Sequence, residues 1–223
     1  INRLDSLTGE IEAVEEPTYD VWLEAWTPQD TLQAREKTDR APYSLWADQG
    51  YLYAVSGQLV KRADVVRRLR NDDETYHIQG ISYDRYAFDT FADEMETQGL
   101  EVPSFEHPQG GSRKSYLPDD NGETGRWSTV KNEEGQYIKV QNDRASLWMP
   151  QSVRLLEAAI LEGRIRLKRN PLLTSALLSV VLAKDTQDNA WFVKAKSTQR
   201  IDPAVALAMA VGLASVKLPK TNG

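Results

Sequence analysis

The chain has 223 residues, of which 40% are hydrophobic and 27% charged, the composition of an ordinary globular protein that is long enough to bury a core. It contains no cysteine, which excludes disulfides, thiolate zinc sites and cysteine nucleophiles. Its two histidines are too few for a histidine-rich metal site, so any metal would need carboxylate ligands, which favour magnesium or manganese. A Ser-His-Asp triad is formally possible, but no G-x-S-x-G motif accompanies it.

The formal net charge of −6 argues mildly against nucleic-acid binding, because phosphate contacts need surplus lysine and arginine. The charge is unevenly distributed, however, since the acidic excess lies near the amino terminus and residues 151–200 are basic. That segment has the basic residues Arg154, Arg164, Arg166, Lys168, Arg169, Lys184, Lys194, Lys196 and Arg200 against the acidic residues Glu157, Glu162, Asp185 and Asp188. An acidic protein with one basic face is therefore compatible with the sequence.

In the amino-terminal quarter, the residue pattern predicts strands first and a helix after them. Residues 5–9 have the composition of a hairpin turn, and residues 19–26 alternate apolar and polar side chains as a strand does. Residues 30–39 are polar and helix-prone, with Leu32 as the main apolar contact. The aromatic residues of 41–57 could stack on bases, but at their spacing a buried core is the more frequent outcome.

The next elements are a short basic helix that ends near Asn71 and a central strand from Tyr76 to Tyr83. A second helix follows, because apolar residues recur there at helical spacing and Gly99 is suited to ending a helix. The apolar residues of that helix are Phe88, Phe91, Ala92 and Met95. This order indicates strands alternating with helices.

Residues 109–143 are polar, glycine-rich and weakly patterned, which predicts a long inserted loop or an exposed hairpin. Within this stretch, residues 127–130 and 137–140 are spaced to pair around a turn. No chemical role follows from the composition of this insertion.

The carboxyl-terminal third predicts a helix that opens at Pro150, then a hairpin in which residues 177–184 pair with residues 190–196. The last element is a nearly all-apolar helix that starts after Asp202-Pro203 and must be buried. Strands followed by helices alternating with strands indicate an α/β or α+β fold with a mixed sheet.

Asp84 is the first candidate for chemistry. It stands at the carboxyl end of a predicted strand and just before a helix, where open α/β sheets place their ligands. The alternative is structural, because aspartate is a favoured N-cap and could simply start the helix. From the local sequence alone, the cap is the more frequent explanation.

Asp202 is the second candidate. Aspartate at the N-cap and Pro203 at the first helical position give a complete structural explanation. A carboxylate at the start of a buried helix is nevertheless costly to desolvate unless a positive group meets it. Lys194, Lys196 and Arg200 could supply that charge, and so could a divalent cation. Two aspartates far apart in sequence at the ends of core elements also suit metal-assisted phosphodiester hydrolysis.

Several segments, taken in order, resemble the nuclease domain of the tailed-phage large terminase subunit, in the branch typified by lambdoid siphophages. The Ile81-Ser-Tyr-Asp-Arg85 segment is similar to the family's I-x-Y-D-R motif, and the segment from Lys196 to Leu207 carries the most specific match. The other matching segments are Leu23-Glu-Ala-Trp-Thr-Pro28, Asp39-Arg-Ala-Pro-Tyr43 with Trp46 and Gly50, Leu147-Trp-Met-Pro150 and Asn170-Pro-Leu-Leu173.

The resemblance implies a ribonuclease-H-like fold over residues 1–223, with three acidic residues that bind two divalent metal ions, Mg²⁺ or Mn²⁺. Asp84 matches the family's second acid and Asp202 its third, and both roles are compatible with capping a helix. The first acid belongs to an opening strand with a G-x-D-x-S pattern, which this sequence lacks. Asp5 is the nearest candidate, but its turn-like surroundings favour the interpretation that the opening strand is absent from the chain.

The resemblance also implies the function of an endonuclease that cuts concatemeric viral double-stranded DNA during genome packaging. Lys194, Lys196 and Arg200 would contact phosphates, although solvation at the surface is the default explanation for such side chains. The implied partners are viral DNA, the portal protein, the small terminase subunit and an ATPase domain upstream in the same polypeptide, in the host cytoplasm and without a membrane. The alternatives are an idle docking or DNA-guiding module, or a resolvase- or transposase-type nuclease of the same fold.

Overall fold

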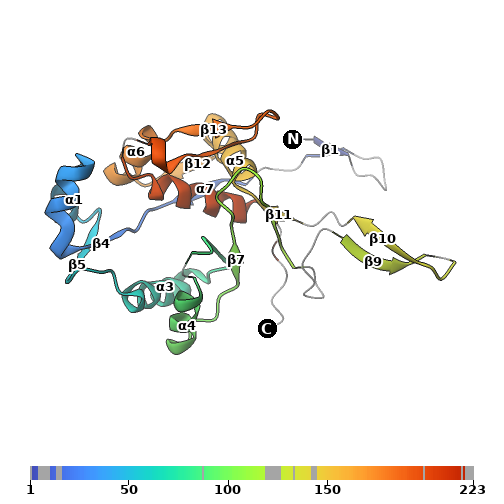
Figure 1. Ribbon diagram of the computed structural model, residues 1–223, viewed down its shortest axis with the longest axis horizontal. Helices are drawn as coiled ribbons and strands as arrows, with labels where there is room; N and C mark the ends of the chain where they lie inside the picture. The colour runs from blue at the N-terminus through green and yellow to red at the C-terminus, as the bar shows by residue number, and fades with distance from the viewer. Residues whose placement is uncertain are drawn as a thin grey trace.

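The structure is a computed structural model that describes residues 2–4, 11–13, 17–86, 88–118, 127–132, 134–141, 145–197, 199–216 and 218. These residues form seven α-helices and fourteen short strands. None of the helices among them is both long and apolar enough to cross a membrane. Figure 1 shows the helices gathered in the body of the molecule, with the hairpin of β9 and β10 extending away from them.

The strands of the described residues pair two by two, in both orientations. The three parallel pairs are β3 (Tyr19–Val21) with β12 (Ile165–Leu167), β4 (Trp26–Pro28) with β5 (Tyr53–Val55), and β6 (Ile81–Tyr83) with β7 (Ser104–Glu106). The four antiparallel pairs are β1 (Asn2–Leu4) with β2 (Ile11–Ala13), β8 (Ser115–Tyr116) with β11 (Ser146–Leu147), β9 (Trp127–Lys131) with β10 (Tyr137–Gln141), and β13 (Leu182–Lys184) with β14 (Ala190–Phe192). The mixed α/β class is therefore confirmed, although small separate sheets take the place of the one mixed sheet that was expected.

The last helix, α7 (Asp202–Ala214), packs against two other helices, α5 and α6, and against strand β6. Its apolar sequence is explained by burial, since Ala204 and Ala208 are fully enclosed and eight of its residues are buried. The other helices are α1 (Leu32–Asp39), α2 (Tyr43–Asp48), α3 (Arg62–Tyr76), α4 (Asp89–Thr97), α5 (Met149–Leu161) and α6 (Pro171–Leu178). The prediction of a buried carboxyl-terminal helix is confirmed.

Two predicted boundaries were wrong in the same region. The helix expected to end near Asn71 continues to Tyr76, and the following strand is only β6 instead of Tyr76–Tyr83. The polar end of α3 has little apolar periodicity, but ion pairs one helical turn apart, such as Arg70 with Glu74, support it. The expected strand over 19–26 is likewise two strands, because β3 and β4 pair with different partners.

Other expectations hold. The helix that ends before Gly99 is α4, and Gly99 adopts the left-handed conformation that glycine tolerates best. The hairpin β9–β10 exists as predicted. The second hairpin exists as β13–β14 but is shorter than expected, because Leu177 and Leu178 end α6 and residues 194–196 form a 3-10 turn. The Asn170-Pro-Leu-Leu173 segment is explained as a helix start, because the Asn170 side chain caps α6 by accepting the amide hydrogens of Leu172 and Leu173.

Candidate functional site

Asp84 follows directly after β6 with its side chain exposed to solvent. Its Oδ1 accepts the backbone N–H of Tyr86 at 3.3 Å, which makes a local turn. The helix begins only at Asp89, with Phe88 before it, so the N-cap explanation for Asp84 was wrong. The carboxylate is instead presented at the carboxyl edge of a parallel strand pair, where a ligand can reach it.

Asp202 is the first residue of α7, and Ile201 occupies the position before it. The helix has no side-chain cap, so the N-cap explanation for Asp202 was wrong as well. The side chain is 62% exposed, and its Oδ1 forms an ion pair with Nζ of Lys194 at 2.8 Å. One of the three basic residues suggested for this carboxylate, Lys194 of the 3-10 turn Lys194–Lys196, therefore meets it. The expected burial of the carboxylate was wrong, because the helix behind it is buried but its first side chain is not.

The two aspartates line the same cavity, of about 640 Å³, together with Lys194 and Gln109. Its apolar wall comes from β6 and from the face of α7 that carries Val205, Met209 and Leu213. The prediction that these distant aspartates share a site is thus consistent with the geometry of the chain.

Gln109 is the lining residue that the sequence did not single out. It follows β7, the parallel partner of β6, so its chain segment leaves the sheet at the same edge as Asp84. The indole N–H of Trp148 donates to the carbonyl of Gly111 at 3.0 Å, which pins the segment to the start of α5. The beginning of the 109–143 insertion is therefore anchored beside the cavity. The polar sequence around Gln109 did not predict this position.

The described residues contain no group of three or more histidine, cysteine, aspartate or glutamate side chains that could hold a metal ion. Two of the three expected acids, Asp84 and Asp202, are among these residues. Asp5, the candidate for the other acid, lies outside them. Among the described residues, two carboxylates, those of Asp84 and Asp202, line one cavity.

The three basic residues expected to contact phosphate occupy different positions. Lys194 lines the cavity with both aspartates, whereas Arg200 lines a second cavity of about 320 Å³ that also includes Asp202. Lys196 is exposed and lies outside both cavities. The Nε of Arg200 donates to Oδ2 of Asp39 at 2.8 Å, a contact that nothing in the sequence predicted.

His107 and Ser152 form a hydrogen-bonded pair in the core, with 2.8 Å between Nε2 and Oγ. The Nδ1 of His107 lies 3.2 Å from the carbonyl of Pro108, which can only accept, so Nδ1 carries the hydrogen and Nε2 accepts from Ser152. Burial lowers the pKa of His107 and keeps the ring neutral. Since both residues are almost fully buried, no substrate reaches them, and the pair is structural.

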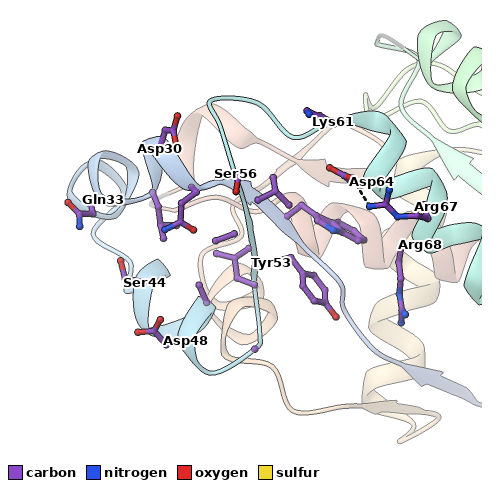
Figure 2. Close-up of a pocket in the computed structure, with 18 of the residues that line it drawn as sticks. Asp30, Gln33, Ser44, Asp48, Tyr53, Ser56, Lys61, Asp64, Arg67 and Arg68 are labelled. Atoms are coloured by element: carbon purple, nitrogen blue, oxygen red, sulfur yellow. Dashed lines mark hydrogen bonds and ion pairs between the residues drawn. The ribbon is translucent and has the colours of Figure 1, made fainter.

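A larger cavity, of about 1110 Å³, lies elsewhere, between α3 and the α1–α2 region. Figure 2 shows Lys61, Arg67 and Arg68 on its α3 side and Asp30 and Asp48 at the opposite end. The arginines are already engaged, in ion pairs with acidic neighbours. The cavity contains neither candidate aspartate, so its size does not make it the candidate site.

The aromatic residues of 41–57 are mainly core, as predicted, because Tyr43 and Trp46 are buried in contact with each other. Tyr53 differs, since it is 45% exposed, stacks on Trp26 and faces the large cavity. The buried aromatic pair supports the segment that holds Asp39, which links this motif to Arg200.

Comparisons with known proteins point to one family. The family described as "Terminase large subunit, endonuclease domain" matches residues 129–217. The "Terminase, large subunit" of Enterobacteria phage HK97 is 30% identical over 222 residues, and the chain spans 37% of the length of that relative.

Among solved structures, the HK97 bacteriophage large terminase superposes with a TM-score of 0.64 at 30% identity, over 84% of this chain and 32% of that one. The large terminase nuclease from thermophilic phage G20c gives a TM-score of 0.40 at 14% identity, over 72% of this chain and 66% of that one. The sequence match to the HK97 protein runs through the whole chain and includes the segments that carry Asp84 and Asp202. The matches identify the nuclease domain of the large terminase subunits of HK97-like phages as the domain that this chain resembles in both sequence and structure.

Proposed function

We propose that this chain is a metal-dependent endonuclease domain that cuts concatemeric viral double-stranded DNA during genome packaging. The observation that carries the proposal is the shared cavity of Asp84 and Asp202, with Lys194 in contact with one of them. Carboxylates that converge from distant elements beside a lysine suit a substrate with a phosphodiester group. The similarity to terminase nuclease domains supports the same reaction.

The donor set fits a hard divalent cation such as Mg²⁺ or Mn²⁺. Asp84, Asp202 and the amide oxygen of Gln109 are oxygen ligands, which is what these ions prefer. The ion pair between Asp202 and Lys194 supports this choice of ligand, because the carboxylate already has a cationic partner. A bound divalent ion would lower the pKa of water and offset the negative charge that develops at phosphorus. We propose that the remaining carboxylate comes from Asp5 or from a segment that precedes the chain.

The chain's own residues would then divide the work. Asp84 and Asp202 would hold the cations, and Lys194 would move from Asp202 to a phosphate oxygen when a metal ion takes its place. Arg200 would contact the same backbone from the second cavity, and Lys196 would add attraction at the rim. The contacts are to phosphates and so predict little dependence on base sequence.

The wider setting belongs to the proposal. The chain spans about a third of its HK97 relative, so the ATPase domain would belong to the remainder of the same polypeptide. The portal protein and the small terminase subunit would be its partners in the host cytoplasm. An idle docking or DNA-guiding module is the competing function, because the described residues hold only part of a carboxylate site.

The test is cleavage of supercoiled plasmid by the intact protein with Mn²⁺ or Mg²⁺. The intact protein should nick and then linearise the plasmid, and Asp84→Asn or Asp202→Asn should slow both steps by at least about a hundredfold, as the loss of a metal ligand misplaces the reacting groups. Asp93→Asn, on the exposed side of α4, is the matched control and should cleave normally. Folded protein that binds DNA but never cuts it would favour the docking module.

A further inference from the structure

Asp39, the last residue of α1, joins two parts of the chain that are 161 residues apart. Its Oδ2 accepts a hydrogen bond from Nε of Arg200 at 2.8 Å and a second one from the hydroxyl of Tyr43 at 3.1 Å. Its side chain is only 12% exposed, whereas that of Arg200 is 55% exposed. The nearly buried carboxylate of Asp39 thus anchors the more exposed guanidinium of Arg200.

The anchor is held by the core. Tyr43 is buried in the cluster formed by Leu32, Ala41, Trp46, Leu52 and Leu172. Burial and the neighbouring Asp39 raise the pKa of Tyr43 to about 12, so its hydroxyl stays a donor at physiological pH. The hydrogen bond from the buried Tyr43 holds the Asp39 carboxylate in place. The position of the Arg200 side chain is therefore set by the carboxylate that it contacts.

The arginine keeps donors for another partner. A guanidinium is planar and has five N–H groups, so a contact through Nε fixes the plane and leaves the two terminal nitrogens available. Arg200 and Asp202 line the same cavity, with only the buried Ile201 between them in the chain. Gln199 is also tied, through a hydrogen bond to Ser175 of α6. The segment before α7 is therefore fastened on both sides of Arg200.

We infer that Asp39 is a positioning residue, which orients the Arg200 guanidinium so that its terminal nitrogens meet a DNA phosphate beside Asp202. The inference rests on the proposed nuclease function and adds a residue to it. It also gives the two polar side chains of the Asp39-Arg-Ala-Pro-Tyr43 segment a shared role, since Tyr43 donates to Asp39 and Asp39 accepts from Arg200. The alternative is an ion pair that only stabilises the fold.

The variants for the test are made in the intact protein. Arg200→Ala should slow plasmid cleavage at saturating DNA by about a hundredfold, the usual effect of losing one charge-stabilising donor. Asp39→Ala should slow it by about tenfold or more, and should add less than about twofold in the Arg200→Ala background, because the two residues act as a unit. Tyr43→Phe removes one of the two hydrogen bonds to the Asp39 carboxylate and should slow cleavage less than Asp39→Ala does. Asp64→Ala, which breaks the ion pair with Arg67 on α3, is the control and should cleave within about threefold of the wild type.

A charge swap separates orientation from stability. Asp39→Arg combined with Arg200→Asp restores an ion pair between the same elements, so the melting temperature should recover. Cleavage should stay as slow as in Arg200→Ala, because the cation now projects from α1. Recovery of cleavage in the swap would overturn the inference and make the pair structural. Wild-type cleavage by Asp39→Ala would overturn it too.

DNA binding without added metal gives a readout that is independent of cleavage. Removing an acidic residue ordinarily strengthens binding to DNA, but loss of the anchor should weaken it and reduce the log–log salt slope by about 0.9, as for one lost phosphate contact. Stronger binding by Asp39→Ala would contradict the inference. If the wild-type protein does not cut DNA at all, the proposed function fails, and this measurement still decides whether Asp39 orients Arg200.

Discussion

The two ends of α7 use polar groups for opposite purposes. At the start of the helix, Asp202 is 62% exposed and contacts Lys194 at the edge of a cavity. Three turns later, Gly212 packs against Ser152 and His107, which are sealed in the core and hydrogen-bonded to each other. A ligand can replace Lys194 as the partner of Asp202, because that ion pair is exposed. No ligand can reach the His107–Ser152 pair, because both residues are buried.

This difference shows how polar residues can be assigned without a bound ligand. A polar group that folding satisfies completely has no interaction left to offer a substrate, as with the His107–Ser152 pair. Asp84 and Asp202 keep acceptor capacity toward solvent, at the ends of elements that the core fixes. Changes at the two ends of α7 should therefore separate ligand binding from stability.

The largest effect is expected for metal binding at the start of α7, where Asp202 is exposed; we call this the open end and the region around Gly212, Ser152 and His107 the closed end. If Asp84 and Asp202 share a cation, a concentration of Mn²⁺ about one hundred times its Kd should stabilise the folded protein by about 2.7 kcal/mol. Thermal melts of the intact protein with and without Mn²⁺ measure this shift. Asp84→Asn and Asp202→Asn should each remove it, and an unchanged shift in both variants would place the metal elsewhere.

At the closed end, Gly212→Ala should destabilise the protein by about 2 kcal/mol, because a methyl group there meets the Ser152 side chain inside a packed core. Chemical denaturation measures the loss, and the double change with Ser152→Gly should recover part of it. Gly110→Ala is the control, since nothing lies within 4 Å of a side chain at that position. An equal loss at Gly110 would mean that the effect comes from the backbone.

The closed end should also respond to pH. Burial lowers the pKa of His107 below its usual value of 6.5, so the unfolded chain takes up a proton before the folded one does. The stabilisation of the folded state by neutral His107 is therefore fully present above about pH 6.5, and it is lost as the pH falls toward the lower pKa of the folded state. Denaturation at pH 8 and pH 5.5 should show a smaller loss for His107→Gln than for the wild type. His77→Gln, which changes an exposed histidine, serves as the control.

The smallest effect is expected at the rim of the open end. Lys196→Ala should reduce the log–log salt slope of DNA binding by about 0.9 and leave stability nearly unchanged, because the side chain is exposed. Lys194→Ala should change the slope less, since removing the lysine also frees the charge of Asp202. Titration of a labelled duplex at several salt concentrations tests both, with Lys168→Ala, just after β12, as a control.

Local sequence determined the elements whose periodicity or turn residues are strong. The apolar α7, the amphipathic α4 and the hairpin β9–β10 are written in the spacing of their residues, and each lies where it was expected. The shared order of short motifs also identified the family and singled out Asp84 and Asp202. Both kinds of information are local or sequential, so a single sequence can carry them.

Only the tertiary structure decided what these residues contact. Local rules made both aspartates helix caps, but the distances show that Asp84 closes a turn and that Asp202 faces Lys194. The anchoring of Arg200 by Asp39 and the approach of Gln109 to the cavity join segments that are remote in sequence. Such contacts depend on how α7 and the parallel strands pack, and packing is set by the burial of the whole chain rather than by any one segment.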